Sequence, residues 1–460
     1  MRHERRTPTQ EFRMSFTMPE TGAFADEAVS HLKNLIRIDT TNPPGGEIAA
    51  ANYCANALEK EGLEPVVLES APGRGNVVCR LHGEGSATPL MLISHLDVVA
   101  AHPEGWDHPP FAAEEADGFI WGRGAVDMKH MAAMSLTVIT QLKRAGFRGK
   151  RDLVISFTAD EEDGGQFGAG WLVENHPDLV RTDYAVGEVG GFSIETPHGR
   201  VYPIMTAEKG VVRMKARAKG AGGHGSMPVS DNAVGKLGIA AYRLSKIHLQ
   251  PRITDAARSF VTTLAARNGG AKGAVMKLML RPGLTDLIID NLVSDPEQKR
   301  YLGAILHNTV TPTVVRAGEK FNVIPTNVEM DLDGRYLPGC PLEEFMEEVE
   351  DALGPTVELE KVWHGEPIEA PSNTPLYEAI RREVESGDRG STVTPYLSAG
   401  FTDWKHYSKL GTRVYGYTPM RLPPGLAFAS LFHGVNERIL KQSYIDGTGA
   451  LMRLAAGYCG

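Results

Sequence analysis

Acidic and imidazole side chains follow three separate apolar runs in this sequence. His95 and Asp97 come directly after the run at residues 90–93, and side chains two positions apart on a strand point the same way. One of the two can therefore bind a metal ion while the other orients it. Carboxylates follow two further runs, at Asp160, Glu161, Glu162 and Asp163 and at Glu188. Any one cluster alone is better explained as solvated loop residues, but their repetition favours a shared site.

The elements that must position these residues alternate between strands and helices. Short apolar segments bounded by turn residues predict strands at residues 64–68, 75–82, 90–93, 153–158 and 184–187. A 3.6-residue period predicts helices at residues 25–38, 47–61, 128–144 and 169–175. This order indicates an α/β domain whose sheet is covered by helices on both faces. Ligands of such sheets bind beyond the carboxyl ends of the strands, so we expect the three clusters at one edge.

The pattern changes near Met205. Apart from a mostly helical stretch at 252–306, we expect strands at 208–218, 313–317, 327–334 and 357–362 and helices at 231–247 and 342–353. Their order is β-α-β-β-α-β, that of a ferredoxin-like sandwich. A helix at 376–385, strands and a last helix at 447–456 follow. We therefore predict a flexible extension over 1–23, a discontinuous α/β domain over 24–205 and 367–460, and an inserted domain over 206–366.

The types of the acidic and imidazole residues indicate which ion they would bind. Histidine and carboxylates without cysteine suit zinc, with cobalt or manganese as alternative ions. The carboxylates outnumber the ligands of one tetrahedral ion, so two ions are expected, and a shared carboxylate would give each ion four ligands. Of the adjacent Glu161 and Glu162, one can bind metal while the other takes a proton from a bridging water.

Length and composition limit the class of protein. A chain of 460 residues is expected to form two domains. Its net charge of −9 does not favour a nucleic-acid partner, and no apolar run is long enough to cross a membrane. The four cysteines are scattered and form no CxxC pair, which is typical of reduced thiols in a cytoplasmic protein. We expect a cytoplasmic protein that acts on a small molecule, without nucleic acid or membrane.

Five motifs carry a resemblance to a known family. They are SHLD at 94–97, GRGAVDMK at 122–129, DEE at 160–162, GE at 187–188 and FHG at 432–434. In order and spacing they resemble the metal motifs of the co-catalytic zinc amidohydrolases and exopeptidases, which include aminoacylase, glutamate carboxypeptidase and succinyl-diaminopimelate desuccinylase. The motifs GHGSMP at 223–228 and NVIP at 322–325 extend the resemblance, which runs from about Ala25 to the C-terminus. It implies a mixed-sheet, zinc-exopeptidase-like catalytic domain with an inserted ferredoxin-like domain.

The resemblance also implies a ligand set for two zinc ions per chain. Asp127 would bridge the two ions, His95 and Glu188 would complete one site, and Glu162 and His433 the other. Asp97 would hold His95 in its metal-binding tautomer. From its sequence context alone, His433 is expected to be a buried structural histidine, and only the resemblance makes it a ligand.

Further residues are implied around the substrate. Glu161 would be the general base while metal-bound hydroxide attacks the amide carbonyl, and it would later protonate the leaving amine. In homodimers of the family, the histidine that matches His224 reaches the neighbouring active site and polarises the carbonyl. Arg335 would bind the substrate carboxylate, with Asn308 near the same pocket. Without the resemblance, His224 reads as a loop residue and Arg335 as a surface charge.

The implied activity is hydrolysis of the amide bond of N-acyl amino acids or of small peptides with a free carboxylate, by a homodimer. The apolar loop at 420–426 favours a hydrophobic acyl group or side chain. One alternative is a dipeptidase or carboxypeptidase that acts on unblocked peptides. Another is an inactive relative that serves as a binding or scaffold protein. Such a relative usually lacks a ligand or the base, and here the whole set is present.

Overall fold

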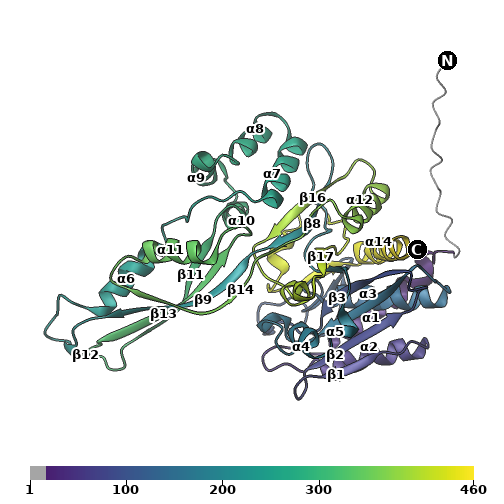
Figure 1. The fold of residues 1–460 in the computed structure, drawn as a ribbon, viewed down its shortest axis with the longest axis horizontal. Helices are drawn as coiled ribbons and strands as arrows, with labels where there is room; N and C mark the ends of the chain where they lie inside the picture. The colour runs from purple at the N-terminus through teal and green to yellow at the C-terminus, as the bar shows by residue number, and fades with distance from the viewer. Residues whose placement is uncertain (1–16) are drawn as a thin grey trace. The chain divides into compact units, whose positions relative to one another are not determined.

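The computed structural model describes residues 17–460, and these divide into two compact units. Unit 1 holds the described residues up to Ala159 together with Ala429–Gly460, and unit 2 is Asp160–Phe428. Unit 1 is thus built from both ends of the chain. Figure 1 shows its C-terminal helix α14 (Lys441–Cys459) beside α1 (Thr21–Arg37) and α3 (Lys129–Arg144), and the three helices pack together.

Unit 1 contains four neighbouring strands of a mixed sheet. Their order is β1 (Val66–Glu69), β2 (Gly75–Leu81), β6 (Arg151–Thr158) and β3 (Ala87–His95). The β1–β2 and β2–β6 pairs are antiparallel, whereas β3 and β6 are parallel. The register pairs His95 with Thr158, the last residues of β3 and β6. Both strands therefore end at one edge, as the sequence predicts.

Helices cover the strands of unit 1. The helix α2 (Ile48–Lys60) packs on β2, and α3 and α14 pack on β3. Fourteen residues of α3 are buried, from Lys129 to Leu142, so this helix lies inside the unit. A separate small sheet contains β18 (Arg438–Leu440), β5 (Phe119–Trp121) and β4 (Glu115–Ala116), in that order.

Unit 2 begins with its own strands of mixed direction. The strand β17 (Arg413–Gly416) pairs in parallel with β7 (Tyr184–Gly187) and antiparallel with β8 (Val201–Glu208). Two further strands pair with β8, namely β16 (Thr392–Ser398), in parallel, and β15 (Ile368–Glu369), antiparallel. Every residue of β8 is buried. The sequence did not predict this strand, because a strand buried on both faces lacks apolar–polar alternation.

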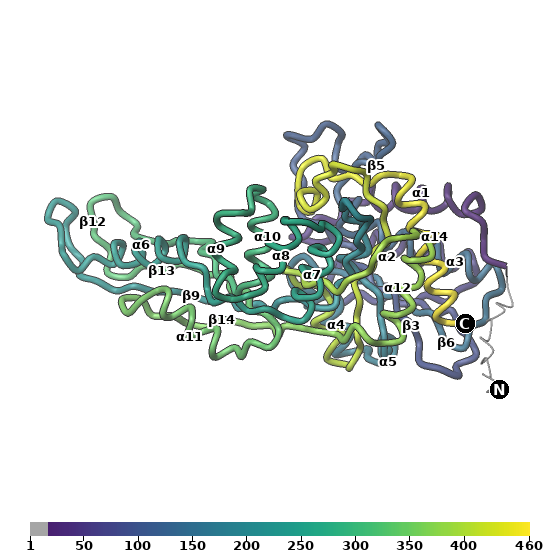
Figure 2. Tube along the Cα trace, turned by 90° about the horizontal axis from the view of Figure 1, so that it is seen from above, coloured from purple at the N-terminus to yellow at the C-terminus, as the bar shows by residue number. Residues whose placement is uncertain are grey.

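The predicted ferredoxin-like module forms a four-stranded antiparallel sheet in unit 2. Its strand order is β11 (Thr309–Ala317), β13 (Asn327–Tyr336), β9 (Gly210–Lys219) and β14 (Glu358–Gly365). The helices α6 (Ala233–Leu244) and α11 (Leu342–Leu353) pack on the face formed by alternate buried residues of β9 and β13. Figures 1 and 2 both show β12 (Val323–Ile324) at one tip of this module.

The stretch at 252–306 contains four helices. They are α7 (Asp255–Asn268), α8 (Gly270–Leu278), α9 (Pro282–Leu292) and α10 (Pro296–Leu306). Their apolar core includes Tyr301, whose ring stacks on that of Tyr396 with centroids 5.9 Å apart. Since Tyr396 belongs to β16, the helical insert is fixed to the strands around β8.

The remaining elements are short or lie near the ends of the chain. They are β10 (Gly223–His224), α4 (Ala169–Asn175), α5 (Pro177–Val180), α12 (Pro375–Gly387), α13 (Trp404–Tyr407) and the 3-10 helices Glu161–Asp163, Ser408–Leu410 and Phe428–Leu431. The helix α1 begins at Thr21, inside the predicted extension over 1–23, of which residues 1–16 lie outside the described part. Among residues 17–460, no helix is long and apolar enough to cross a membrane.

Candidate metal centre

The strand β3 delivers a buried histidine whose tautomer is set by Asp97. His95 is 1% exposed, and its Nδ1 lies 3.0 Å from the main-chain carbonyl oxygen of Asp97. A carbonyl oxygen can only accept, so Nδ1 carries the ring proton. The carboxylate oxygen Oδ1 of Asp97 lies 3.4 Å from the same nitrogen, and Oδ2 accepts from Asn42 Nδ2 at 2.8 Å. Asp97 thus contacts His95 mainly through its main chain, which leaves Nε2 free of the ring proton.

Asp127 faces two histidines through its two carboxylate oxygens. His95 Nε2 lies 3.2 Å from Oδ1, and His433 Nε2 lies 3.1 Å from Oδ2. Burial by itself raises the pKa of Asp127, but the contacts with His433 and His95 outweigh it and hold the pKa below its usual range. A carboxylate that presents one oxygen to each of two imidazoles has the arrangement needed to bridge two ions.

The donor set at Asp127 fits a divalent cation. With the ring proton of His95 on Nδ1, both Nε2 and the facing oxygen of Asp127 are acceptors, and two acceptors 3.2 Å apart repel each other. A cation between them, either a proton or a metal ion, removes this repulsion. Imidazole nitrogen and carboxylate oxygen without sulfur are ligands that zinc takes in catalytic sites.

A buried ion pair braces Asp127 and His433. Glu437 Oε1 accepts from the main-chain nitrogens of Val126 at 2.7 Å and Asp127 at 3.1 Å, and Oε2 accepts from Arg123 Nη1 at 2.7 Å. Arg123 also donates to the main-chain oxygen of His433 at 3.3 Å. Burial raises the pKa of Glu437 to about 7, and the charge of Arg123 opposes this rise. Sequence reasoning missed Glu437, although Arg123 lies in the motif that contains Asp127.

The carboxylates predicted after β6 lie in unit 2, on a loop packed against α13. Glu161 and Glu162 form a 3-10 helix, and Glu161 is 7% exposed. His406 Nε2 donates to the main-chain oxygen of Gly164 at 2.9 Å. The next residue, Gly165, has φ 72°, and a Cβ there would lie 2.6 Å from Asp403 Oδ1. The chain can approach α13 this closely only because residue 165 is a glycine.

A buried lysine adds positive charge near these carboxylates. Burial lowers the pKa of Lys405, and the charges of Glu161, Asp403 and Glu208 oppose this effect. Its Nζ lies 3.5 Å from the ring centroid of Phe401. Glu208 is itself fully buried. Burial raises its pKa to about 8, and the charge of Glu188 adds to this rise.

The residues predicted to contact substrate lie in the ferredoxin-like module. His224 is exposed on β10, which pairs with β12 at the tip of the module, and its Nδ1 lies 2.7 Å from Ser226 Oγ. Arg335 binds both carboxylate oxygens of Asp333, at 2.6 and 3.0 Å, and its guanidinium lies 5.2 Å from the ring centroid of Phe401.

Asn308, in contrast, is 1% exposed and has partners within the module. Its Oδ1 accepts from the main-chain nitrogen of Leu337 at 2.9 Å, and its Nδ2 donates to Glu348 Oε2 at 3.1 Å. The side chain therefore connects the start of β11, the end of β13 and α11. Its role in substrate binding stays a prediction.

Buried histidine and carboxylate side chains at strand ends of a mixed α/β fold are typical of a metal-dependent hydrolase. The chain belongs to peptidase family M20/M25/M40, whose family model matches residues 91–457. It is therefore an enzyme of a metal-dependent family of hydrolases that act on amide or peptide bonds, and the family predicted from the five motifs is confirmed.

Known proteins with similar sequences or folds cover most of the chain. The N-fatty-acyl-amino acid synthase/hydrolase PM20D1 of Xenopus tropicalis is 29% identical over 370 residues, which is 77% of this chain and 69% of that protein. Aminoacylase-1 of Homo sapiens is 25% identical over 437 residues, or 93% and 94% of the two chains. The M20 metallo-carboxypeptidase Sso-CP2 of Sulfolobus solfataricus has a TM-score of 0.69 at 18% identity, with 94% of this chain and 99% of that chain covered. This likeness confirms the predicted mixed α/β fold class.

Proposed function

We propose that this enzyme is a dizinc hydrolase that cleaves the amide bond of N-acyl amino acids or of small peptides with a free carboxylate. The geometry at Asp127 supports this best, because its two oxygens face His95 at 3.2 Å and His433 at 3.1 Å. Two relatives, at 25% and 29% identity, are named for such substrates, as an aminoacylase and an N-fatty-acyl-amino acid synthase/hydrolase.

The proposed ligand set takes one residue from each of the five motifs. Asp127 would bridge the ions, with His95 and Glu188 on one and Glu162 and His433 on the other. Glu162 follows β6 and Glu188 follows β7, and strand ends are where α/β sheets bind ligands. Bound zinc, or cobalt or manganese in its place, would acidify a water molecule and polarise the substrate carbonyl.

Glu161 is the proposed proton carrier. Its carboxylate would take a proton from the attacking water and later give it to the leaving amine. Two observations support this role: the side chain is 7% exposed, and the charge of the buried Lys405 acts on it. A nearby positive charge favours the ionised carboxylate that a base requires.

The ferredoxin-like module is proposed to complete the substrate site. Arg335 would bind the substrate carboxylate through its planar guanidinium, with Asn308 close by. The exposure of His224 would allow it to reach the active site of a second subunit. This assignment needs a homodimer, with residues 206–366 as the dimerisation or lid domain and residues 24–205 with 367–460 as the catalytic domain. A cytoplasmic location stays a prediction.

A substrate panel tests the proposal. The acyl group and the amino acid of N-acyl amino acids are varied separately, and unblocked dipeptides are assayed alongside. We expect kcat/KM to be at least about tenfold higher for the blocked substrates, and higher for apolar than for charged acyl groups, a difference of about 1.4 kcal/mol or more in transition-state binding. Faster cleavage of unblocked dipeptides would instead indicate a dipeptidase or carboxypeptidase. No turnover, with well under two zinc ions per chain, would indicate an inactive scaffold.

A further inference from the structure

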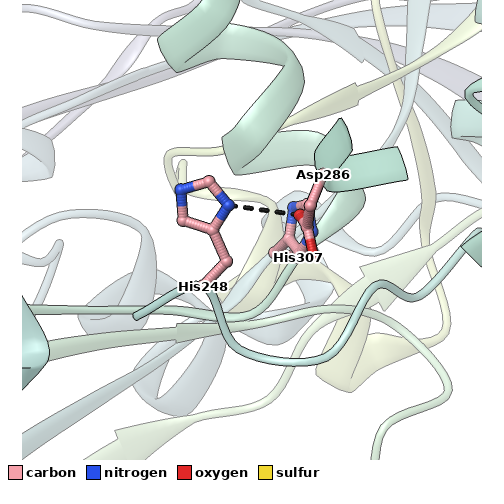
Figure 3. A group of neighbouring side chains, drawn as sticks. All are labelled: His248, Asp286 and His307. Carbon is pink, nitrogen blue, oxygen red and sulfur yellow. Dashed lines mark hydrogen bonds and ion pairs between the residues drawn. The ribbon is translucent and has the colours of Figure 1, made fainter. Parts of the chain in front are cut away.

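A second group of metal-binding side chains lies in unit 2, apart from the residues assigned to catalysis. Figure 3 shows His248, Asp286 and His307 pointing toward one another. The three come from different segments, because His248 follows α6, Asp286 lies in α9, and His307 directly follows α10. One ligand atom from each lies within 4.8 Å of the other two.

The hydrogen bonding of His307 leaves one ring nitrogen facing a carboxylate. Nδ1 lies 2.9 Å from the main-chain oxygen of Gly303, so it carries the ring proton. Nε2 lies 2.8 Å from Asp286 Oδ1, yet it is buried and makes no hydrogen bond of acceptable geometry. His307 is 3% exposed. With the ring proton on Nδ1, Nε2 and the carboxylate oxygen are two acceptors 2.8 Å apart, and a bound cation would remove their repulsion.

The spacing of the three atoms is close to that around a zinc ion. His248 Nδ1 and His307 Nε2 lie 3.2 and 2.8 Å from the same oxygen, Asp286 Oδ1. Ligand atoms about 2.0 Å from a tetrahedral zinc ion lie about 3.3 Å apart. The His248 and Asp286 side chains are each more than 40% exposed, so both can rotate to adjust this spacing around an ion.

We propose that His248, Asp286 and His307 form a separate binding site for zinc, or for another divalent ion that prefers imidazole, with water as the fourth ligand. The site is open to solvent, because His248 and His307 line a cavity of about 430 Å³. Asp290, one turn after Asp286 on α9, adds a second negative charge and is held by Lys299 at 2.9 Å.

The ion would fasten the helical insert to the ferredoxin-like module. Through Asp286 it would join α9 to His248, which follows α6, and to His307, which precedes β11. The main-chain oxygen of His307 accepts from the buried Lys209 Nζ at 2.8 Å, and Lys209 lies between β8 and β9. An ion at His307 would thus fix the start of β11 and the connection between the two sheets of unit 2. This role is structural and does not depend on the proposed function.

Ion counting by native mass spectrometry tests the site in the full-length enzyme. The protein is stripped with a chelator, reloaded with zinc and counted. His248→Ala and Asp286→Asn each remove an exposed ligand, and each is expected to lose about one ion per chain. His364→Ala is the control, because His364 faces a single carboxylate, Glu366 at 3.2 Å, without a second histidine. It should keep the full count.

Copper loading gives a second readout that does not require activity. Electron paramagnetic resonance of the wild type should show a signal with two nitrogen ligands, which falls to one nitrogen in His248→Ala. Equal ion counts in the wild type, His248→Ala and Asp286→Asn would overturn the proposal and leave a hydrogen-bonded cluster only. Asp127→Ala separates the two hypotheses. If it loses no ion while Asp286→Asn does, the catalytic proposal fails and this one stands.

Discussion

His433 Nε2 lies 3.1 Å from Asp127 Oδ2, although the two residues come from opposite ends of the chain. The other oxygen, Oδ1, faces His95 at 3.2 Å. The main chain on both sides of this contact is held by one buried ion pair, between Arg123 and Glu437. The geometry that supports a shared carboxylate thus depends on a pair that would not itself touch metal or substrate.

Removing the charge of Glu437 should therefore affect both stability and metal binding. Glu437→Gln leaves Arg123 buried without a counter-charge and should lower the free energy of unfolding by about 3 kcal/mol. Zinc affinity should fall as well, because Asp127 loses part of its main-chain support. Chemical denaturation and zinc titration measure the two effects. The double variant Arg123→Met/Glu437→Met should recover stability but not zinc affinity, and recovery of neither would contradict this explanation.

A single substitution can distinguish the proposed role of Glu161 as a base from a role in metal binding. Glu161→Gln keeps the shape of the side chain but cannot accept the proton, so kcat should fall by about a hundredfold to ten-thousandfold. The metal content should not change. Asp163→Asn, an exposed position in the same 3-10 helix, serves as the control and should retain activity. If Glu161→Gln remained active, the proton-carrier role would be wrong.

The assignment of Arg335 predicts a change in substrate binding. Arg335→Met should raise KM for an N-acyl amino acid by about tenfold to a hundredfold, because a charged hydrogen bond to the carboxylate is lost. The corresponding amide, which has no carboxylate, should show little difference between the variant and the wild type. Arg316→Met is the matched control, since Arg316 also pairs with a carboxylate, Asp331 at 2.8 Å. An equal rise in KM in Arg335→Met and Arg316→Met would indicate a general effect on stability.

Acid should weaken unit 1 through Glu27. Burial alone raises the pKa of Glu27, but bonds with His31, Arg144 and Gln141 outweigh it and lower the pKa from 4.5 to about 2. The unfolded state therefore binds more protons between these values, so the stabilisation is complete above about pH 4.5 and is lost as the pH falls toward 2. Because the side chain is partly exposed to solvent, we expect a contribution of only about 1 kcal/mol.

Thermal unfolding at pH 7 and pH 3.5 measures this contribution. Glu27→Gln should lower the melting temperature at pH 7 and have a smaller effect at pH 3.5. Glu59→Gln, at an exposed position on α2 with no contact of this kind, should change neither value. If Glu27→Gln lowered the melting temperature equally at both pH values, the carboxylate charge would not be the cause.

Local pattern predicted most of the fold. The boundaries of α4, β7 and α11 agree with prediction to the residue. In α11, four buried apolar residues recur at helical spacing, and a glycine follows the helix at Gly354. The β-α-β-β-α-β order was also predictable, because buried residues alternate with more exposed ones along β9 and β13. The strand β8 was not, because it is buried throughout.

The site could be predicted only where residues of metal-binding type stand directly after a predicted strand. His95 and Asp97 at the end of β3 could be recognised as a possible metal pair from their spacing alone. His433 could not, because only its contact with Asp127 and the family resemblance distinguish it from a structural histidine. Glu437 and the group at His248 were missed, since pairs and clusters between distant segments depend on tertiary structure that a local pattern does not contain.

Because unit 1 needs Ala429–Gly460 as well as the N-terminal strands, the order of synthesis matters. His433 and α14 leave the ribosome only after all of unit 2 has been made. A growing chain therefore contains Asp127 and His95 long before it contains their last partner. We expect prematurely terminated chains that lack His433 to bind metal ions more weakly than the chain that contains it.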